Sequence, residues 1–287
     1  MNQSQCDCEI HYLDGSSSLG LLIFHKFSFT TGNVHPTIAF GCGYDQVDEG
    51  MGENMLVDGM FGLGRGSVDL VSQLKQQKII TQNVIGHCFN SKGGGFRIIG
   101  KDVPSSSHIS WVPMSKNSKY YSPGRATLHL DMKSIVTKPM EVVLDSGSTY
   151  THFPEDLHDQ LVAALKASLS KSSVEEVHDP ALPLCWKGPR PFKSVDDLKK
   201  ELKPLLSLNF GGGVTMKIPP ENYLIITRHG NACFAILAKK EIDLYIIGDI
   251  TMQDQLVIYD NENERISWQQ YPCGKKTKSK SAIVSRI

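Results

Sequence analysis

The sequence predicts a mainly β protein of two lobes with a few short helices. Short apolar runs rich in β-branched residues, such as 84–89 and 244–247, recur along the chain between turns rich in glycine, asparagine and aspartate. A polar stretch rich in serine, residues 101–108, is typical of a linker. We therefore expect a first lobe over residues 1–102 and a second lobe over residues 103–287.

Composition limits the kinds of partner. The chain has 287 residues, of which 40% are hydrophobic, enough for one large domain or two of moderate size. Its formal net charge is zero, which argues against nucleic acid as the main partner. No apolar run reaches the length of a membrane span, and the N-terminal region shows no signal peptide.

The first half predicts a hairpin, further strands and one helix. A glycine-containing turn at 14–20 separates two strands, and a polar loop at 45–56 precedes an apolar run at 58–64 that we interpret as a buried strand running into a turn. Ser67 is the expected N-cap of a helix over 68–76. The other strands of this half are expected at 8–13, 21–24, 37–43, 84–89 and 96–99.

The second half predicts two helices and a series of strands. Pro154 opens the first helix, with two acidic residues in the turn that follows, where they favour the macrodipole. Ser194 caps the second helix, and Pro204 should end or kink it. The basic tail, 275–287, is expected to be a solvated end. Strands are expected at 109–114, 126–130, 141–144, 214–218, 223–226, 233–237, 245–247, 256–259 and 265–268.

One apolar run ends in an acidic residue. Asp145 closes the run 142–144, and the residues that follow it are Ser146, Gly147, Ser148 and Thr149. Burying a charged group among apolar residues costs free energy unless the group accepts hydrogen bonds. This loop offers hydroxyl groups and a glycine N–H as donors. We interpret Asp145 as a carboxylate held at the end of a buried strand and aimed outward. The tetrad alone fits an ordinary Asp-Ser-Gly turn equally well, whereas its apolar flanks disfavour a phosphorylated signal in a disordered segment.

Two other phrases make the tetrad more specific. The apolar run 244–247 ends in Gly248, and residues 57–64, Val-Asp-Gly-Met-Phe-Gly-Leu-Gly, form a similar phrase earlier in the chain. Together these motifs resemble the pepsin-like aspartic proteases, in particular their plant nucellin-like and nepenthesin-like branch, over nearly the whole chain. The resemblance implies a bilobal acid protease fold and an aspartic endopeptidase that hydrolyses peptide or protein substrates.

The resemblance also implies site residues. Asp145 would be catalytic. The residues that would orient it and line the substrate cleft are Ser146, Gly147, Ser148 and Thr149. The residues that would belong to a flap closing over the substrate are Tyr12, Gly15 and Ser16. Without the resemblance, Tyr12 fits a strand tyrosine packed on a sheet face.

Such proteases use two carboxylates that share one proton: one activates water, and the other hydrogen-bonds to the scissile carbonyl. Asp145 is the only aspartate of this chain in an Asp-Ser-Gly or Asp-Thr-Gly triplet, and the resemblance implies a second one before the flap. We therefore expect an incomplete first lobe and a monomeric chain that is inactive alone. The resemblance implies no metal and no cofactor, and an extracellular or vacuolar location for the complete protein.

Two alternatives to a proteolytic monomer follow from the same motifs. A non-catalytic pepsin-fold binding protein, as in the plant xylanase inhibitors that resemble this family, need not keep the Asp-Ser-Gly-Ser loop, so the presence of that loop argues against this alternative. A dimeric protease in which each copy donates Asp145 is disfavoured, because this chain is long and itself two-lobed.

The chain has seven cysteines without the paired short spacings of a zinc site. Their wide scatter suits disulfides in an oxidising compartment, with buried thiols of a cytosolic protein as the alternative. The resemblance implies two pairs, Cys185 with Cys233 and Cys88 with Cys273. It also implies upstream partners for Cys6 and Cys42, and leaves Cys8 as a spare thiol.

Overall fold

The computed structural model describes residues 6–12, 16–29, 34–47, 59–100, 110–274 and 283–286. Strands predominate, which confirms the mainly β prediction. The described helices are α1 (Leu70–Gln76), α2 (Glu155–Leu169) and α3 (Val195–Glu201), and the described 3₁₀ turns are η1 (Gly211–Gly213), η2 (Pro220–Asn222) and η3 (Ile250–Met252).

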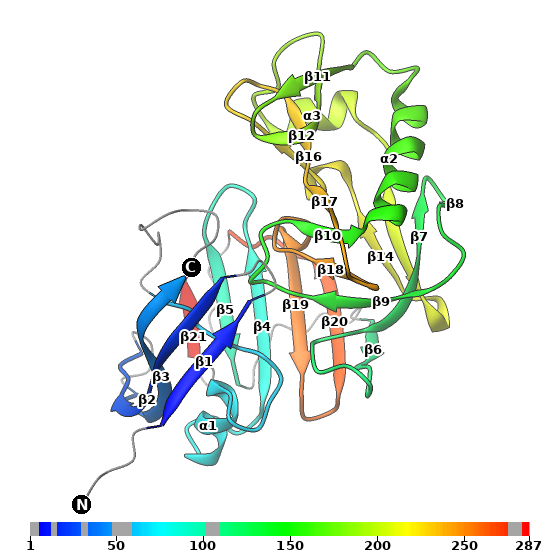
Figure 1. Cartoon of the computed structure of the whole chain (residues 1–287). Helices are drawn as coiled ribbons and strands as arrows, with labels where there is room; N and C mark the ends of the chain where they lie inside the picture. The colour runs from blue at the N-terminus through cyan, green and yellow to red at the C-terminus, as the bar shows by residue number, and fades with distance from the viewer. Residues whose placement is uncertain are drawn as a thin grey trace, which may run out of the picture.

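An antiparallel sheet of three strands begins the chain. Its order is β1-β2-β3, and its strands are β1 (Asp7–His11), β2 (Ser17–Lys26) and β3 (Thr37–Val47). The strands β1 and β2 form the predicted hairpin, and β2 is longer at both ends than the strand expected at 21–24. The sheet lies near α1 at the lower left of the molecule (Figure 1).

A six-stranded sheet joins segments from both ends of the chain. Its order is β21-β5-β4-β19-β20-β6. The strands are β4 (Val84–Phe89), β5 (Gly95–Ile99), β6 (Trp111–Pro113), β19 (Gln255–Asp260), β20 (Arg265–Gln270) and β21 (Ile283–Arg286). Figure 1 shows β4 and β5 beside β19 and β20 at the centre of the molecule. One sheet therefore contains strands from both sides of the linker expected at 101–108.

The largest sheet contains β9, the strand that Asp145 directly follows. Its order is β14-β13-β7-β9-β18-β10-β17, with β8 paired to β7. The strands are β7 (Gly124–Leu130), β8 (Lys133–Ser134), β9 (Met140–Leu144), β10 (Thr151–Pro154), β13 (Leu206–Phe210), β14 (Thr215–Ile218), β17 (Ile236–Lys239) and β18 (Leu244–Ile247). The β9–β18 and β10–β17 pairs are parallel.

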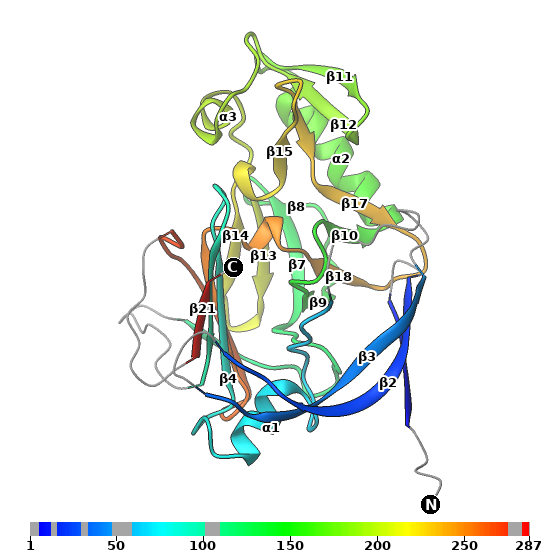
Figure 2. The same ribbon diagram turned by 90° about the vertical axis from the view of Figure 1, so that its left-hand side faces the viewer.

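A smaller sheet of four strands lies at the far end of the second half, close to α2 and α3 (Figure 2). Its order is β11-β12-β16-β15. The strands are β11 (Glu175–Asp179), β12 (Leu182–Lys187), β15 (Leu224–Ile226) and β16 (Ala232–Phe234). A disulfide between Cys185 and Cys233 joins β12 to β16, and a second one, between Cys88 and Cys273, joins β4 to the segment after β20.

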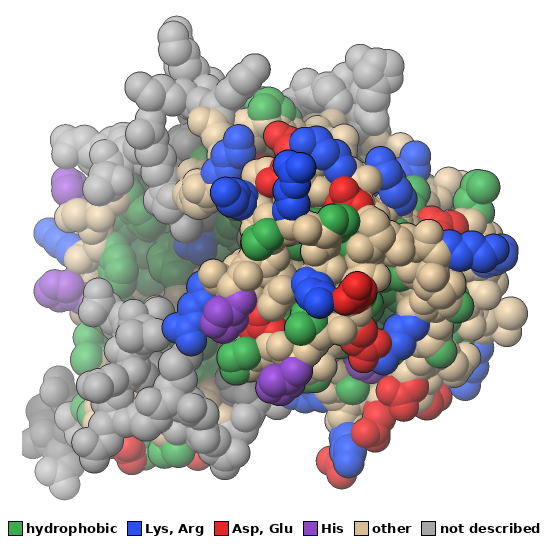
Figure 3. Space-filling model, turned by 90° about the horizontal axis from the view of Figure 1, so that it is seen from above, with side chains coloured by type: hydrophobic (Ala, Val, Ile, Leu, Met, Phe, Trp, Pro, Cys, Tyr) green, Lys and Arg blue, Asp and Glu red, His purple; other side chains and the backbone are tan. Residues whose placement is uncertain are grey.

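Large apolar side chains stay exposed around the first sheet. Phe24 on β2 is 72% exposed, and Met60, which follows the sheet in the chain, is 61% exposed. The same region also exposes Ile10, Leu22, Tyr44, Val47 and Phe61. Seen from above, hydrophobic side chains line a hollow on the left of the molecule, the half that contains β1 to β5 (Figure 3).

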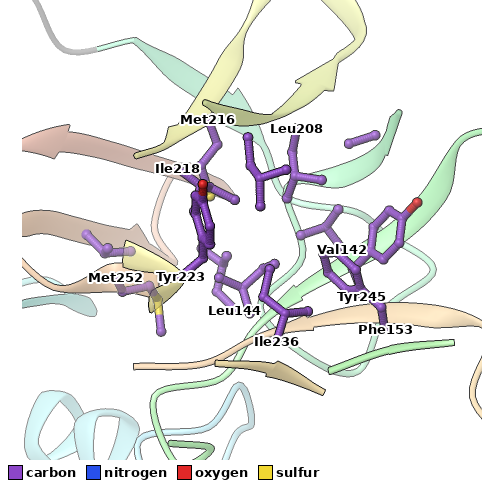
Figure 4. Close-up of a cluster of buried hydrophobic side chains, with 14 of the residues drawn as sticks. Val142, Leu144, Phe153, Leu208, Met216, Ile218, Tyr223, Ile236, Tyr245 and Met252 are labelled. Carbon is purple, nitrogen blue, oxygen red and sulfur yellow. The ribbon is translucent and has the colours of Figure 1, made fainter. Parts of the chain in front are cut away.

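The core lies under the largest sheet. Figure 4 shows Val142 and Leu144 of β9 pointing toward the same cluster as Phe153 and Tyr245. The rings of Phe153 and Tyr245 lie 4.5 Å apart, and both side chains are fully buried. Each such side chain contributes roughly 1.5–3 kcal/mol through burial. The buried side chains of these neighbouring strands therefore hold the end of β9 in the core.

The helices begin where polar caps satisfy their first N–H groups. At α3 the predicted cap is correct, because the Ser194 hydroxyl accepts from the Asp197 N–H at 3.2 Å. At α1 the prediction was wrong. Asp69 is the N-cap instead of Ser67, since its carboxylate accepts from the N–H groups of both Val71 and Ser72.

Two other predictions were wrong. The described part of the apolar phrase, 59–64, forms no strand and exposes Met60 and Phe61; a strand needs a hydrogen-bonded partner, and no described strand pairs with this segment. The tail was expected to be only a solvated end, but Ile283–Arg286 pairs with β5 as strand β21. The four-residue run Ile-Val-Ser-Arg suits the free edge of β5.

Candidate active site

Two parallel strands position the candidate catalytic carboxylate. Leu144, the last residue of β9, is aligned with Ile247, the last residue of β18. The N–H of Asp145 donates to the Ile247 carbonyl at 3.0 Å, and the N–H of Leu144 donates to the Tyr121 carbonyl at 2.9 Å. Asp145 thus follows directly after two paired strands and is half-buried at their carboxyl ends.

The residues that follow hold both oxygens of this carboxylate. The N–H of Gly147 donates to Asp145 Oδ1 at 2.9 Å, and the Ser148 hydroxyl donates to Oδ2 at 2.7 Å. A carboxylate accepts on both oxygens only when its lone pairs face donors, so this loop favours one orientation of the side chain. Ser146 and Thr149 are exposed, while Ser148 is half-buried.

Gly248 brings a second loop against the first. The N–H of Asp249 donates to the Ser148 carbonyl at 2.8 Å, and that of Ile250 donates to the Thr149 carbonyl at 3.3 Å. A Cβ at position 248 would lie 2.4 Å from the Tyr150 carbonyl oxygen, so only glycine fits there. The close approach of these two loops depends on this missing side chain.

Two buried threonines tie the loops together underneath, and sequence reasoning missed them. The hydroxyls of Thr151 and Thr251 are 2.7 Å apart, and Thr151 Oγ1 also accepts from the Gly248 N–H at 3.0 Å. Both side chains are buried. A threonine in a strand gives no signal of such a contact, because its partner is 100 residues away in the sequence.

Two titratable groups near this loop have shifted pKa values. Burial raises the pKa of Asp249 to about 6, although its hydrogen bond with the Ile250 N–H opposes the shift. Burial and the positive charge of Lys239 lower the pKa of His152, against opposing contributions from the Tyr150 backbone and the Asp145 charge. The second loop therefore carries a carboxyl group that ionises less readily than a solvated one.

A stack of side chains leads from the Asp145 strand to the six-stranded sheet. The rings of Tyr121 and Tyr259 lie 4.2 Å apart, and the Tyr259 hydroxyl is 3.1 Å from His87 Nε2. Burial raises the pKa of Tyr259, and the neighbouring Tyr121 and Asp145 add to the shift. His87 is buried and stacks on Phe89 with ring centroids 4.5 Å apart.

The predicted flap is described only in part. The N–H of Tyr12 donates to the Ser16 carbonyl at 2.8 Å, which closes the base of the β1–β2 turn. Both residues are half-buried. Gly15 lies outside the described residues. The part that Tyr12 and Ser16 take in covering a substrate stays a prediction.

Three features bear on partners and location. Among the described residues no group of three or more His, Cys, Asp or Glu side chains is arranged to hold a metal ion. No described helix combines the length and the apolarity that crossing a bilayer requires. Both disulfide pairs implied by the resemblance are present, and Cys6, Cys8 and Cys42 are free thiols.

The sequence matches the family of eukaryotic aspartyl proteases over residues 1–271. The chain belongs to this family. An aspartic proteinase of rice, Oryza sativa subsp. japonica, is 44% identical over 302 residues, a match that covers 100% of this chain and 73% of the relative. Nepenthesin-2 of Nepenthes gracilis is 27% identical, with 95% of this chain and 62% of the relative covered. The predicted plant branch of the pepsin-like family is thereby confirmed.

A solved structure shares the fold. Basic 7S globulin from soybean superimposes with a TM-score of 0.73 at 16% sequence identity, over 92% of this chain and 72% of the other. This likeness confirms the pepsin-like fold class.

Proposed function

We propose that this aspartyl protease family member is an aspartic-type endopeptidase in which Asp145 is one carboxylate of the catalytic pair. The observation that carries the proposal is the loop geometry: both oxygens of a half-buried carboxylate accept hydrogen bonds from Gly147 and Ser148 directly after two parallel buried strands. Family membership adds the reaction class, the hydrolysis of peptide bonds.

In this proposal Asp145 works with a second carboxylate that shares one proton with it. The ionised member removes a proton from water, which attacks the scissile carbonyl, while the protonated member hydrogen-bonds to the carbonyl oxygen. The proton taken from water then passes to the leaving amine as the C–N bond breaks. The donors on Asp145 fix its orientation and leave the remaining lone pairs for the shared proton and the water.

The chain by itself is proposed to be inactive. Its 287 residues contain the Asp-Ser-Gly or Asp-Thr-Gly triplet once, so the second carboxylate has no counterpart of the same kind in this sequence. We propose a monomer that acts on peptide or protein substrates. Its two disulfides support an oxidising location, extracellular or vacuolar.

Two peptidase assays test this proposal. The chain alone should cleave no denatured protein substrate at acidic pH. A chimera that adds the part of the rice proteinase outside the matched region should cleave it, and pepstatin should block the cleavage. In the chimera, Asp145→Asn should lower the rate by at least about 10³-fold, because a neutral amide cannot act as the base. Asp243→Asn, at an exposed position, is the matched control and should leave the rate unchanged.

The alternative is a non-catalytic pepsin-fold binding protein, against which the presence of the Asp-Ser-Gly-Ser loop argues. A folded chimera without peptidase activity would support this alternative and contradict the role proposed for Asp145. Activity of the chain alone that rises with the square of its concentration would instead indicate a dimer with two copies of Asp145.

A further inference from the structure

A polar groove lies outside the candidate active site. It encloses about 930 Å³ between α3, η2, the turn that joins β13 to β14, and the ends of β19 and β20. The residues that line it do not include any member of the loop 145–149. The proposed peptidase activity therefore gives this groove no role.

The floor of the groove comes from the six-stranded sheet. Gln255 of β19 is paired with Gln270 of β20, and Trp268 is two residues before Gln270 on the same face of β20. Trp268 is half-buried, with its ring against that of Phe210 at 5.3 Å. The packed side fixes the indole, and the accessible part provides a flat apolar surface within a polar groove.

Several side-chain amides line the groove. Each amide offers donors and an acceptor at the same place. The lining residues of this kind are Asn222, Gln253, Gln255, Gln269 and Gln270. Asn222 Nδ2 donates to the Ile250 and Gln253 carbonyls, and Gln255 Nε2 donates to the Thr251 carbonyl, so internal bonds fix the orientation of both amides. Such a surface suits a ligand whose groups both donate and accept.

The charges that line the groove balance. Lys199 and Lys217 are matched by Glu221 and Asp254. Lys199 Nζ lies 2.5 Å from Glu221 Oε1, while Glu221 Oε2 is shielded from solvent and has no hydrogen-bond partner among the described residues. A polyanion or a polycation would meet as much repulsion as attraction here, so the charges of the groove favour a neutral ligand.

We propose that this groove binds a neutral oligosaccharide. The apolar face of one sugar ring would lie on Trp268, and sugar hydroxyls, which donate and accept, would bond to the amides of Gln255 and Gln270. A peptide strand fits less well. The edge strand β14 borders the groove, but it presents Lys217, and lysine on an edge strand discourages the addition of another strand.

Calorimetric titration of the full chain with cellohexaose, xylohexaose and mannohexaose tests the proposal. At least one of the three should bind saturably. Gln270→Ala, at an exposed position, should weaken that binding about tenfold, the equivalent of one hydrogen bond to an amide, and Trp268→Ala should weaken it further. Gln160→Ala, an exposed glutamine on α2, is the matched control and should bind as the unchanged chain does. Asp145→Asn should also bind normally, which separates this result from the peptidase assay.

Four results would overturn the proposal. The first is no binding of any of the three sugars at about 1 mM, the weak limit of specific affinity. The second is that Gln270→Ala and Trp268→Ala both bind the sugar as tightly as the unchanged chain does, when circular dichroism shows that both variants are folded. The third is tighter binding of an acidic oligogalacturonate than of any neutral sugar. The fourth is that an extended peptide binds in the groove and none of the three sugars competes with it.

Discussion

Gly248 lies where the two loops of the candidate site come closest. A Cβ there would overlap the carbonyl oxygens of Tyr150 and Ser148 at 2.4 and 2.8 Å. We predict that Gly248→Ala lowers the free energy of unfolding by about 2–3 kcal/mol, since backbone atoms must move to admit the methyl group. Urea denaturation measures the change. Gly62→Ala, where a Cβ would meet nothing within 4 Å, is the control, and an equal loss in both variants would refute the packing argument.

His87 makes the fold sensitive to acid. Burial, with a smaller contribution from Arg97, lowers its pKa from 6.5 to about 3, so the imidazole stays neutral in the folded chain. Between these two values the unfolded chain binds a proton that the folded chain does not. The contribution of His87 to the free energy of unfolding is therefore fully present above pH 6.5. It falls as the pH drops toward 3, by up to about 1.4 kcal/mol per pH unit.

We predict that His87→Gln flattens this dependence. Between pH 7 and pH 4 the variant should lose roughly 2–3 kcal/mol less unfolding free energy than the unchanged chain, because glutamine does not titrate. Urea denaturation at both pH values measures the difference. His178→Gln, at an exposed position on β11, is the control. The same acid slope in the unchanged chain and in His87→Gln would show that His87 is not the group responsible.

The candidate site could be predicted from the sequence only where its contacts are local. Asp145 and its donors Gly147 and Ser148 lie within four residues, so the tetrad itself indicated the loop. The contact between Thr151 and Thr251 spans 100 residues, and the stack from Tyr121 to His87 depends on separate strands and loops. No local pattern encodes such pairs, because they depend on how the sheets assemble.

At the scale of elements, the sequence predicted the N-cap of one helix correctly and that of another wrongly. Ser194 begins α3 as predicted, but at α1 the sequence offers Ser67 and Asp69 two residues apart. Either residue can cap a helix. The carboxylate of Asp69 accepts from two N–H groups and also from the Ser72 hydroxyl at 2.7 Å. These three hydrogen bonds explain why α1 begins after Asp69.

The disulfide between β12 and β16 should carry much of the stability of the four-stranded sheet. Cys185 and Cys233 are 48 residues apart, and both are fully buried. We predict that the Cys185→Ala/Cys233→Ala double variant loses about 4 kcal/mol of unfolding free energy, the loop entropy that the bond removes from the unfolded chain. Urea denaturation without reductant measures the loss. Cys42→Ala, an exposed free thiol, should change little, and a similar loss there would contradict the assignment.

At the scale of the molecule, the sequence indicated the strands of the six-stranded sheet but not which strands pair with one another. The runs 84–89 and 256–259 were both predicted, and nothing local connects them. In the structure Val84 is paired with Asp260 and Cys88 with Leu256. The order of strands depends on which apolar faces meet, so periodicity along the chain could not predict it.

The exposed apolar surface of the first sheet predicts self-association. Phe24 lies on the same face of β2 as the exposed Leu22, and Met60, which follows the sheet in the chain, is also exposed, whereas Met132, 92% exposed, lies at the β7–β8 turn. We predict that Phe24→Ser/Met60→Ser lowers binding of a hydrophobic dye and slows aggregation, with unfolding free energy unchanged within roughly 0.5 kcal/mol. Dye fluorescence and light scattering measure both effects. Met132→Ser is the control, and an equal improvement there would argue against a patch.

The shared sheet has a consequence for synthesis. Strands β4 and β5 emerge from the ribosome long before their outer neighbours, β19 beside β4 and β21 beside β5. During translation the early pair must wait with both outer edges open, so a chaperone that shields nascent edges should bind it until the residues around 260 are made. Release from that chaperone, and not the rate of any local step, would then set when the protein matures in the cell.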